Sequence, residues 1–280
     1  MHTTRSVHWL IAGEYRSKND VLDSPLASLR LRAGALASVE SPIFSLSVGD
    51  TLPEDVQVCV IGKIGHYILE QRQAYWWGQL DQRPSLRLVL DYTDDHLSFD
   101  SPLRDFYRAC LARVHAVVCS SARLAQSVQN HYQGTIEVMD DALDIPVRAP
   151  SPVRRNPTTL LWFGHGSNTP ALIEWLAEFT WKDPLRLLAL TDGHGVQMIT
   201  GTPLKTRAQL QLLLDQWSPA KMAAAAAQAD LTVLPVDMNQ PAKLGVSANR
   251  LLTSLALGLP TAADTVDAYL PHQTYWAPLR

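Results

Sequence analysis

Short apolar runs alternate with helix-like segments along nearly the whole chain, and this alternation limits the folds that the sequence can adopt. Within each run the apolar residues are nearly continuous, which is typical of strands buried on both faces. Such strands occur in parallel sheets that carry helices on each side. The pattern therefore predicts an α/β fold built from parallel sheets.

The first half of the chain predicts one such sheet. We expect strands at residues 7–12, 43–48, 56–62, 86–95, 115–120 and 135–141. We expect helices at residues 24–38, 66–80, 101–114 and 121–132. A Ser-Pro pair marks two of the helix starts, Ser24-Pro25 and Ser101-Pro102, because proline is tolerated in the first turn of a helix.

The second half repeats the pattern after a different kind of segment. Residues 145–157 hold four prolines and three arginines without an apolar period, as a linker would. Further strands are expected at 159–164, 185–191, 210–217, 229–236 and 259–264, with helices at about 169–179, from 218 and from 247 or 249. We therefore predict an N-terminal domain at 1–145, a linker at 146–157 and a C-terminal domain at 158–280.

Composition and charge exclude several classes of partner. The net charge is −3, which argues against a large electrostatic surface for nucleic acid or anionic lipid. The three cysteines lack CxxC spacing, as in a cytoplasmic protein with reduced thiols. No apolar segment approaches the ~20 residues of a transmembrane helix, and the first apolar run is too short for a signal peptide. We expect a cytoplasmic protein without a transmembrane segment or a nucleic-acid partner.

A glycine-containing loop follows the expected strand at 159–164. In open parallel sheets, ligands bind beyond the carboxyl ends of the strands. Gly164 and Gly166 would let the backbone approach a ligand closely, with His165 between them and a helix start behind. The alternative is a tight turn that needs glycine only for its geometry.

The stretch KLGVSANR carries the more specific signal of this half. Lys243, Ser247, Asn249 and Arg250 gather where a helix begins. A helix N-terminus carries an effective charge of ~+0.5, so cations there oppose helix stability. A bound phosphate or diphosphate would account for them. The alternative is that Ser247 or Asn249 only caps the helix while the two cations are solvated.

In the first half, the expected strand 86–95 ends in Asp91, Asp94, Asp95 and His96. These groups suit a general base, a binding site for substrate hydroxyls or a metal site. An extended strand would turn Asp94 and Asp95 to opposite sides, so we expect one of them to matter more, and Asp95 is favoured by its neighbour His96. The alternative is a solvated turn in which the aspartates act as caps.

Two cations, Arg30 and Lys63, are expected on the same side of this domain. Each is a weak signal by itself, because a lone cation is usually solvated. The sequence lacks GxSxG, HExxH and GxxxxGK[ST] motifs, which removes support for common hydrolase, zinc-protease and P-loop functions.

Four segments together resemble a known family. HAVVCSSARLAQSVQ and IEVMDDALDIP resemble the segments that close its first domain, and LLWFGHGSN resembles the first strand and loop of its second. ADLTVLPVDMNQPAKLGVSANRLLTSLALGLPTAAD resembles its donor-binding segment. With these segments in the same order and spacing, the chain resembles the GT-B glycosyltransferases of the retaining, family-four-like superfamily.

The resemblance implies two Rossmann-like domains facing across a cleft, with a nucleotide-sugar on the second and an acceptor on the first. It implies transfer without a metal or a further cofactor, to an acceptor that could be a glycan, a lipid-linked glycan or a protein. The implied donor-binding residues are Gly164, His165, Gly166, Lys243, Ser247, Asn249 and Arg250. The catalytic candidates are Asp95, Asp94 and His96, and the acceptor-side candidates are Arg30 and Lys63.

The chain departs from the family at an acidic pair. The superfamily often carries two glutamates seven residues apart around the donor loop. Here Asp237 is the acid nearest the first position, and the second position falls at Gly245. Two alternatives to a transferase follow: a non-catalytic binding or scaffold protein of GT-B shape, and a sugar-nucleotide epimerase or a phosphorylase on the same fold.

Overall fold

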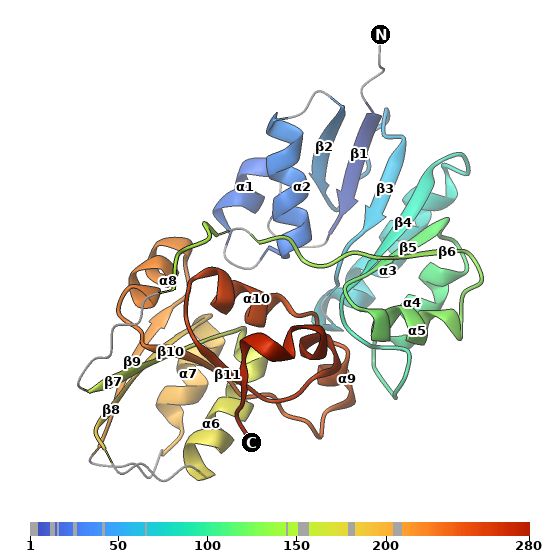
Figure 1. Ribbon diagram of the computed structural model, residues 1–280. Helices are drawn as coiled ribbons and strands as arrows, with labels where there is room; N and C mark the ends of the chain where they lie inside the picture. The colour runs from blue at the N-terminus through green and yellow to red at the C-terminus, as the bar shows by residue number, and fades with distance from the viewer. Residues whose placement is uncertain are drawn as a thin grey trace. The chain divides into compact units, whose positions relative to one another are not determined.

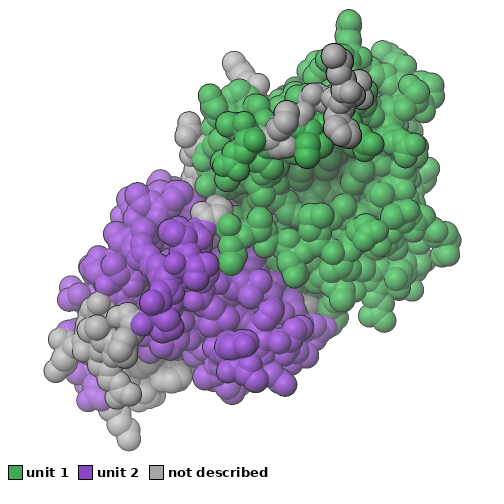
Figure 2. All heavy atoms as spheres, turned by 45° about the horizontal axis from the view of Figure 1, so that its top comes forward, with its two compact units in different colours: residues 1–144, 245–247 green, residues 145–244, 248–280 purple. Residues whose placement is uncertain are grey.

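The computed structural model describes residues 5–11, 15, 17–24, 27–40, 43–64, 66–143, 145–150, 157–178, 183–203 and 209–280. The chain divides into two compact units, coloured green and purple in Figure 2. The first contains residues 1–144 and 245–247, and the second contains residues 145–244 and 248–280. Each unit holds one six-stranded sheet in which every neighbouring pair of strands is parallel (Figure 1). The predicted class, an α/β fold with two parallel sheets, is confirmed.

The sheet of the first unit has the strand order β2-β1-β3-β4-β5-β6. Its strands are β1 (Arg5–Leu10), β2 (Phe44–Gly49), β3 (Val58–Ile61), β4 (Arg87–Tyr92), β5 (Ala116–Cys119) and β6 (Thr135–Val138). Its helices are α1 (Lys18–Asp23), α2 (Leu29–Glu40), α3 (His66–Asp81), α4 (Arg104–Leu111) and α5 (Ala122–Gln129). All six expected strands of this half are present, because each is an apolar run long enough to be buried on both faces.

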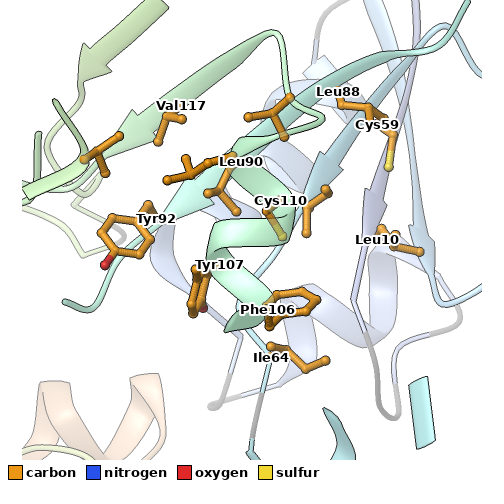
Figure 3. Packing of buried hydrophobic residues seen from close by; sticks show 14 of the residues in the cluster. Leu10, Cys59, Ile64, Leu88, Leu90, Tyr92, Phe106, Tyr107, Cys110 and Val117 are labelled. Carbon is orange, nitrogen blue, oxygen red and sulfur yellow. The ribbon is translucent and has the colours of Figure 1, made fainter. Parts of the chain in front are cut away.

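The core of the first unit lies between this sheet and its helices. Figure 3 shows Tyr107 and Cys110 of α4 beside Leu90 and Tyr92 of β4, and all four side chains are buried. The rings of Tyr92 and Tyr107 meet edge to face with centroids 5.1 Å apart. Aromatic pairs of this geometry add to the burial of their area. This packing fixes the carboxyl end of β4, where candidate site residues follow.

The helix expected at 24–38 starts later than predicted, and the start signal was misassigned. Ser24 follows the last residue of α1, as its C-cap, and α2 begins at Leu29; Pro25 lies outside the described residues. The sequence did not predict α1, whose six residues are too few for an apolar period. Its one local signal was Ser17, which forms a capping box with Asp20.

The sheet of the second unit has the order β12-β11-β10-β7-β8-β9. Its strands are β7 (Thr158–Phe163), β8 (Leu185–Thr191), β9 (Leu210–Gln216), β10 (Leu231–Leu234), β11 (Thr261–Ala263) and β12 (Ala277–Pro278). Its helices are α6 (Thr169–Glu178), α7 (Gly193–Gly201), α8 (Pro219–Ala226), α9 (Pro241–Leu244) and α10 (Asn249–Ala256), with 3₁₀ helices η1 (Gly166–Asn168) and η2 (Asp267–Tyr275). Of the expected linker, residues 151–156 lie outside the described residues.

Several parts of the second unit were not predicted, among them α7, α9 and the C-terminal segment. The helix α7 has the sequence GHGVQMITG, and its three glycines lower its helix propensity and hide its period. The C-terminal segment with η2 and β12 carries a proline inside the 3₁₀ helix, which breaks any regular pattern. The first omission matters for the site, because α7 begins next to the loop that follows β7.

Candidate functional site

In the second unit, Lys243 contacts the loop that follows β7. Its Nζ atom donates hydrogen bonds to Ser167 Oγ at 3.2 Å and to Asn168 Oδ1 at 3.0 Å. Lys243 and Asn168 are 75 positions apart in the sequence. The structure therefore brings together two of the predicted donor-binding segments, residues 164–166 and Lys243. Sequence reasoning placed Ser167 and Asn168 in this loop but gave them no contact.

The same loop is held from its other side by Asp192, which lies directly after β8. Its Oδ2 accepts a hydrogen bond from the Gly166 N–H at 2.6 Å, and its Oδ1 accepts one from the Gly195 N–H at 2.9 Å. His165 Nε2 lies 3.3 Å from Oδ2. Burial favours the neutral acid, but the two N–H groups and His165 outweigh it and hold the pKa of Asp192 below its usual range.

Glycine is needed at one of the two predicted loop positions. A Cβ atom on Gly166 would lie 2.8 Å from Asp192 Oδ1 and 2.9 Å from the Gly195 nitrogen, which is closer than such atoms can pack. A Cβ atom on Gly164 would meet its nearest neighbour, Asn168 Nδ2, at 3.4 Å, which is tolerable. The close approach is thus between the loop and the start of α7.

The helix α10 begins at Asn249, one of the two predicted positions, but no side chain of the predicted residues caps it. Its N-cap residue is Ala248, and the structure records no side-chain cap there among the described residues. Ser247, which belongs to the first unit, instead donates from Oγ to Asp141 Oδ2 at 2.6 Å. Asn249 is the first residue of the helix. The alternative interpretation, in which Ser247 or Asn249 only caps this helix, is therefore wrong, and the carboxylate of Asp141 takes the Ser247 hydroxyl instead.

Arg250 is the second residue of α10 and is partly buried. Its Nη1 atom is shielded from solvent, and the guanidinium interacts with the Tyr269 hydroxyl. Burial raises the pKa of Tyr269, and the nearby positive charge of Arg250 opposes this rise. A partly buried guanidinium at the start of a helix is suited to pair with an anionic ligand.

In the first unit, Arg30 of α2 forms a buried ion pair at the end of β4. Its Nη2 atom lies 2.8 Å from Asp91 Oδ1, and the two side chains are 6% and 3% exposed. Arg30 also donates from Nη1 to the Met139 carbonyl at 3.1 Å and lies 3.7 Å from Asp141. Burial raises the pKa of Asp91 to about 6, although the positive charge of Arg30 opposes the rise. Arg30 is thus the buried ion-pair partner of Asp91 at the carboxyl end of β4.

Lys63 and Asp94 form a second ion pair in this unit, and it faces solvent. The Nζ atom lies 2.5 Å from Asp94 Oδ2, and the side chains are 56% and 29% exposed. The Asp94 carboxylate raises the pKa of Lys63. Because β4 ends at Tyr92, Asp94 and Asp95 lie beyond the strand, so the expectation that strand alternation separates their side chains is wrong.

Asp95 is buried and its Oδ1 is a hydrogen-bond acceptor for the following turn. It accepts from the Leu97 and Ser98 N–H groups at 3.1 and 3.0 Å, from Ser127 Oγ at 3.1 Å and from the Tyr92 hydroxyl at 3.4 Å. Burial alone would raise the pKa of Asp95, but the hydrogen bonds outweigh it and lower the pKa. This is the geometry of the capping alternative.

His96 is also engaged by its surroundings. Its ring stacks on Tyr107 with centroids 5.1 Å apart, and its Nδ1 lies 2.7 Å from Ser101 Oγ. Burial lowers the pKa of His96, so the ring is held in its neutral form. Of the two carboxylate candidates at this strand end, Asp94 is partly exposed and Asp95 is buried.

Within the described ranges the chain offers neither a metal centre nor a disulfide nor a membrane-spanning helix. No group of three or more His, Cys, Asp or Glu side chains there is arranged to hold a metal ion. The three cysteines, Cys59, Cys110 and Cys119, are buried and form no disulfide. No helix in these ranges combines the length and the apolar character needed to cross a membrane.

Comparison with known proteins identifies the fold class. No protein-family model matches the sequence, and no curated protein matches it. Among solved structures, an alpha-glucosyltransferase (AGT) in complex with UDP gives a TM-score of 0.60 at 11% identity. The match covers 93% of this chain and 80% of that chain. An alpha-glucosyltransferase in complex with UDP and a 13-mer DNA containing a HMU base gives 0.59 at 12% identity, with the same coverage.

TarM gives a TM-score of 0.51 at 9% identity, over 75% of this chain. The chain spans only 41% of the length of TarM. At these identities the similarity is one of fold. The two parallel-sheet units have the GT-B fold, which the resemblance of the four sequence segments implied.

Proposed function

We propose that this chain is a cytoplasmic glycosyltransferase that moves a sugar from a nucleotide diphosphate donor to an acceptor hydroxyl, without a metal or cofactor. The observation that carries the proposal is the contact of Lys243 with Ser167 and Asn168 at the carboxyl end of β7. Ligands of parallel sheets bind at such ends. The UDP named in the two alpha-glucosyltransferase complexes supports the same ligand class.

The donor site of this proposal is in the second unit. As the bond from the sugar to the diphosphate breaks, negative charge grows on the leaving phosphate oxygens. The Lys243 ammonium and the shielded Arg250 guanidinium stabilise that charge, together with N–H groups at the start of α10. The proposed donor-binding residues of this unit are Gly164, His165, Gly166, Lys243, Asn249 and Arg250; Ser247, also a candidate from the sequence, belongs to the first unit, where Asp141 takes its hydroxyl.

The acceptor site of this proposal is in the first unit. The acceptor hydroxyl forms the new bond to the sugar and gives its proton to a carboxylate. Asp94 is the candidate that the geometry supports best, because it is partly exposed and paired with the exposed Lys63. In this proposal the carboxyl end of β4 is supported by Asp95, His96 and Arg30. The acceptor is proposed to be a glycan, a lipid-linked glycan or a protein.

Calorimetry with nucleotides tests the donor site. UDP, GDP, CDP and TDP are titrated into the protein with EDTA present and then with Mg²⁺. One of them should bind under both conditions, and Lys243→Ala and Arg250→Ala should each weaken it by ~1.5–3 kcal/mol, the range of hydrogen bonds to charged groups. Lys221→Ala is the control, because this exposed lysine of α8 pairs with Asp215. Absence of binding to every nucleotide would contradict the proposal.

A non-catalytic binding protein of the same fold is the second candidate, and Gly245 favours it. A Cβ atom at Gly245 would lie 2.9 Å from Leu124 Cδ2 and 3.4 Å from Asp95 Cβ, so a glutamate does not fit there without movement. The second acidic position of the superfamily is thus closed. Mass spectrometry of co-purifying nucleotide-sugars, followed by incubation with glycan acceptors, separates the two. A binding protein would retain the donor intact, and a transferase would consume it.

A further inference from the structure

We infer that Asp192 is a positioning residue, which holds the loop 164–168 where Ser167 and Asn168 meet Lys243; its effect on a ligand rests on the proposed function. The carboxylate joins two segments of the second unit. Oδ2 accepts from the Gly166 N–H at 2.6 Å, and Oδ1 accepts from the Gly195 N–H at 2.9 Å. One oxygen thus holds the loop and the other caps α7.

The loop 164–168 and the start of α7 both pack closely against their neighbours, at Gly166 and at Gly195. A Cβ atom on Gly166 would approach Asp192 Oδ1 to 2.8 Å. A Cβ atom on Gly195 would collide with Thr191 Oγ1 and come within 2.9 Å of Thr169 Oγ1. Both threonines are fully buried, so neither side can move aside easily. The carboxylate therefore acts between two segments that have little freedom to shift.

The contacts of Asp192 and of Lys243 with the loop both fall within one short turn. Asp192 holds the loop at Gly166, and Lys243 binds it at Ser167 and Asn168, within the single 3₁₀ turn η1. The turn is closed by the Asn168 N–H, which donates to the His165 carbonyl at 2.8 Å. A displacement at Gly166 is thus carried directly to the two oxygens that Lys243 contacts.

The direction of the change in nucleotide affinity on Asp192→Asn distinguishes a positioning role of Asp192 from a purely electrostatic one. Asp192 is an anion near the proposed phosphate site, so loss of its charge alone would tighten nucleotide binding. Loss of its hydrogen bonds would loosen the loop and weaken nucleotide binding. In Asp192→Asn the amide keeps one acceptor oxygen and loses the charge, so it cannot hold both N–H groups as the carboxylate does. Positioning predicts weaker binding, and a charge effect predicts tighter binding.

Amide hydrogen exchange in the nucleotide-free protein tests the loop directly. Asp192→Asn keeps one acceptor oxygen, so we expect exchange to be at least ~10-fold faster than in the wild type at the one of Gly166 and Gly195 that loses its charge-assisted hydrogen bond. Asp215→Asn is the matched control, because Asp215 is a carboxylate at the end of the neighbouring strand β9 whose partner, Lys221, lies outside the loop. Unchanged exchange at both Gly166 and Gly195 would overturn the inference, whatever the protein binds.

UDP calorimetry provides the functional arm. Asp192→Asn should weaken binding by ~10-fold, and the same change in a Lys243→Ala background should have less than about a twofold effect, because the contact it organises is already lost. Equal effects in both backgrounds, or tighter binding, would overturn the inference. If Asp192→Asn does not fold, Gly166→Ala displaces the same contact, with Gly201→Ala as its unhindered control. If the wild type binds no UDP while exchange rises as expected, the proposed function fails and the loop role of Asp192 stands.

Discussion

The Nη2 atom of Arg30 lies 2.8 Å from Oδ1 of Asp91, and solvent reaches neither side chain appreciably. The pair joins α2 to the end of β4. A buried pair of this kind gains little net stability, but the loss of one partner leaves the other charge buried and costs several kcal/mol. Asp91 therefore has a structural role at the carboxyl end of β4. Its titration should change the free energy of unfolding of the protein.

The first prediction concerns pH. Burial raises the pKa of Asp91 to about 6 in the folded protein, above its value of about 3.8 when exposed. The folded state thus binds this proton more tightly than the unfolded state, and the contribution to stability is complete below pH ~4 and lost as pH rises through about 6. Arg30, Lys63, Asp94 and Asp141 are the charged groups around it.

Urea unfolding at pH 4 to 7 tests this sign on wild type and Asp91→Asn. The asparagine does not titrate, so the stability of the wild type relative to the variant should fall as pH rises, by at most about 3 kcal/mol for a shift of ~2 units. Asp215→Asn, which alters an exposed carboxylate, is the control. A difference that stays constant or grows with pH would contradict the assignment.

The second prediction is that Asp95 contributes to stability. Asp95→Ala removes the acceptor of two backbone N–H groups and of the Ser127 hydroxyl, so it should lower the free energy of unfolding by ~1–3 kcal/mol. Thermal and urea unfolding measure the loss. A variant as stable as the wild type would show that these hydrogen bonds are replaced by water and would reopen a direct chemical role for Asp95.

The sequence predicted the parts of the fold that depend on local pattern. Runs such as VQVCVIG and LRLLALT are strands because their residues are apolar on both faces. The helix α7 escaped prediction because its glycines weaken the local signal, although Asp192 caps it. The loop, Lys243 and Arg250 could be placed from the rule that ligands lie at the carboxyl ends of parallel strands.

The pairings within the candidate site were beyond the sequence. Ser247 had an obvious local role as a cap, and only the fold shows that Asp141 takes its hydroxyl. Asp95 was favoured over Asp94 by its neighbour His96, but Asp95 is enclosed by its own turn and Asp94 is partly exposed. Such outcomes depend on which distant groups compete for a side chain, and a local pattern contains no information on that competition.

The third prediction is a stabilising change. Gly78 lies inside α3 and is exposed, and a Cβ atom there would meet nothing within 4 Å. Gly78→Ala should therefore raise the free energy of unfolding by ~0.5–1 kcal/mol, because alanine loses less backbone entropy in a helix. Gly62→Ala is the contrasting variant, since its Cβ would come within 2.9 Å of the Trp9 ring and should destabilise the protein. Urea unfolding of both variants gives the comparison, and a destabilised Gly78→Ala would contradict the placement of this helix position.

The last prediction concerns Asp94, which is the accessible carboxylate at the end of β4. If it accepts the proton of the acceptor hydroxyl, Asp94→Asn should lower the rate of sugar transfer by ~10²–10⁴-fold while donor binding stays intact. Its partner Lys63 is largely exposed, so the ion pair adds little to folding, and the melting temperature should change little. Lys63→Met provides the matched control, because it removes the ion pair and keeps the carboxylate. Transfer that falls equally in both variants would assign the effect to the ion pair, and full activity in Asp94→Asn would exclude Asp94 as the base.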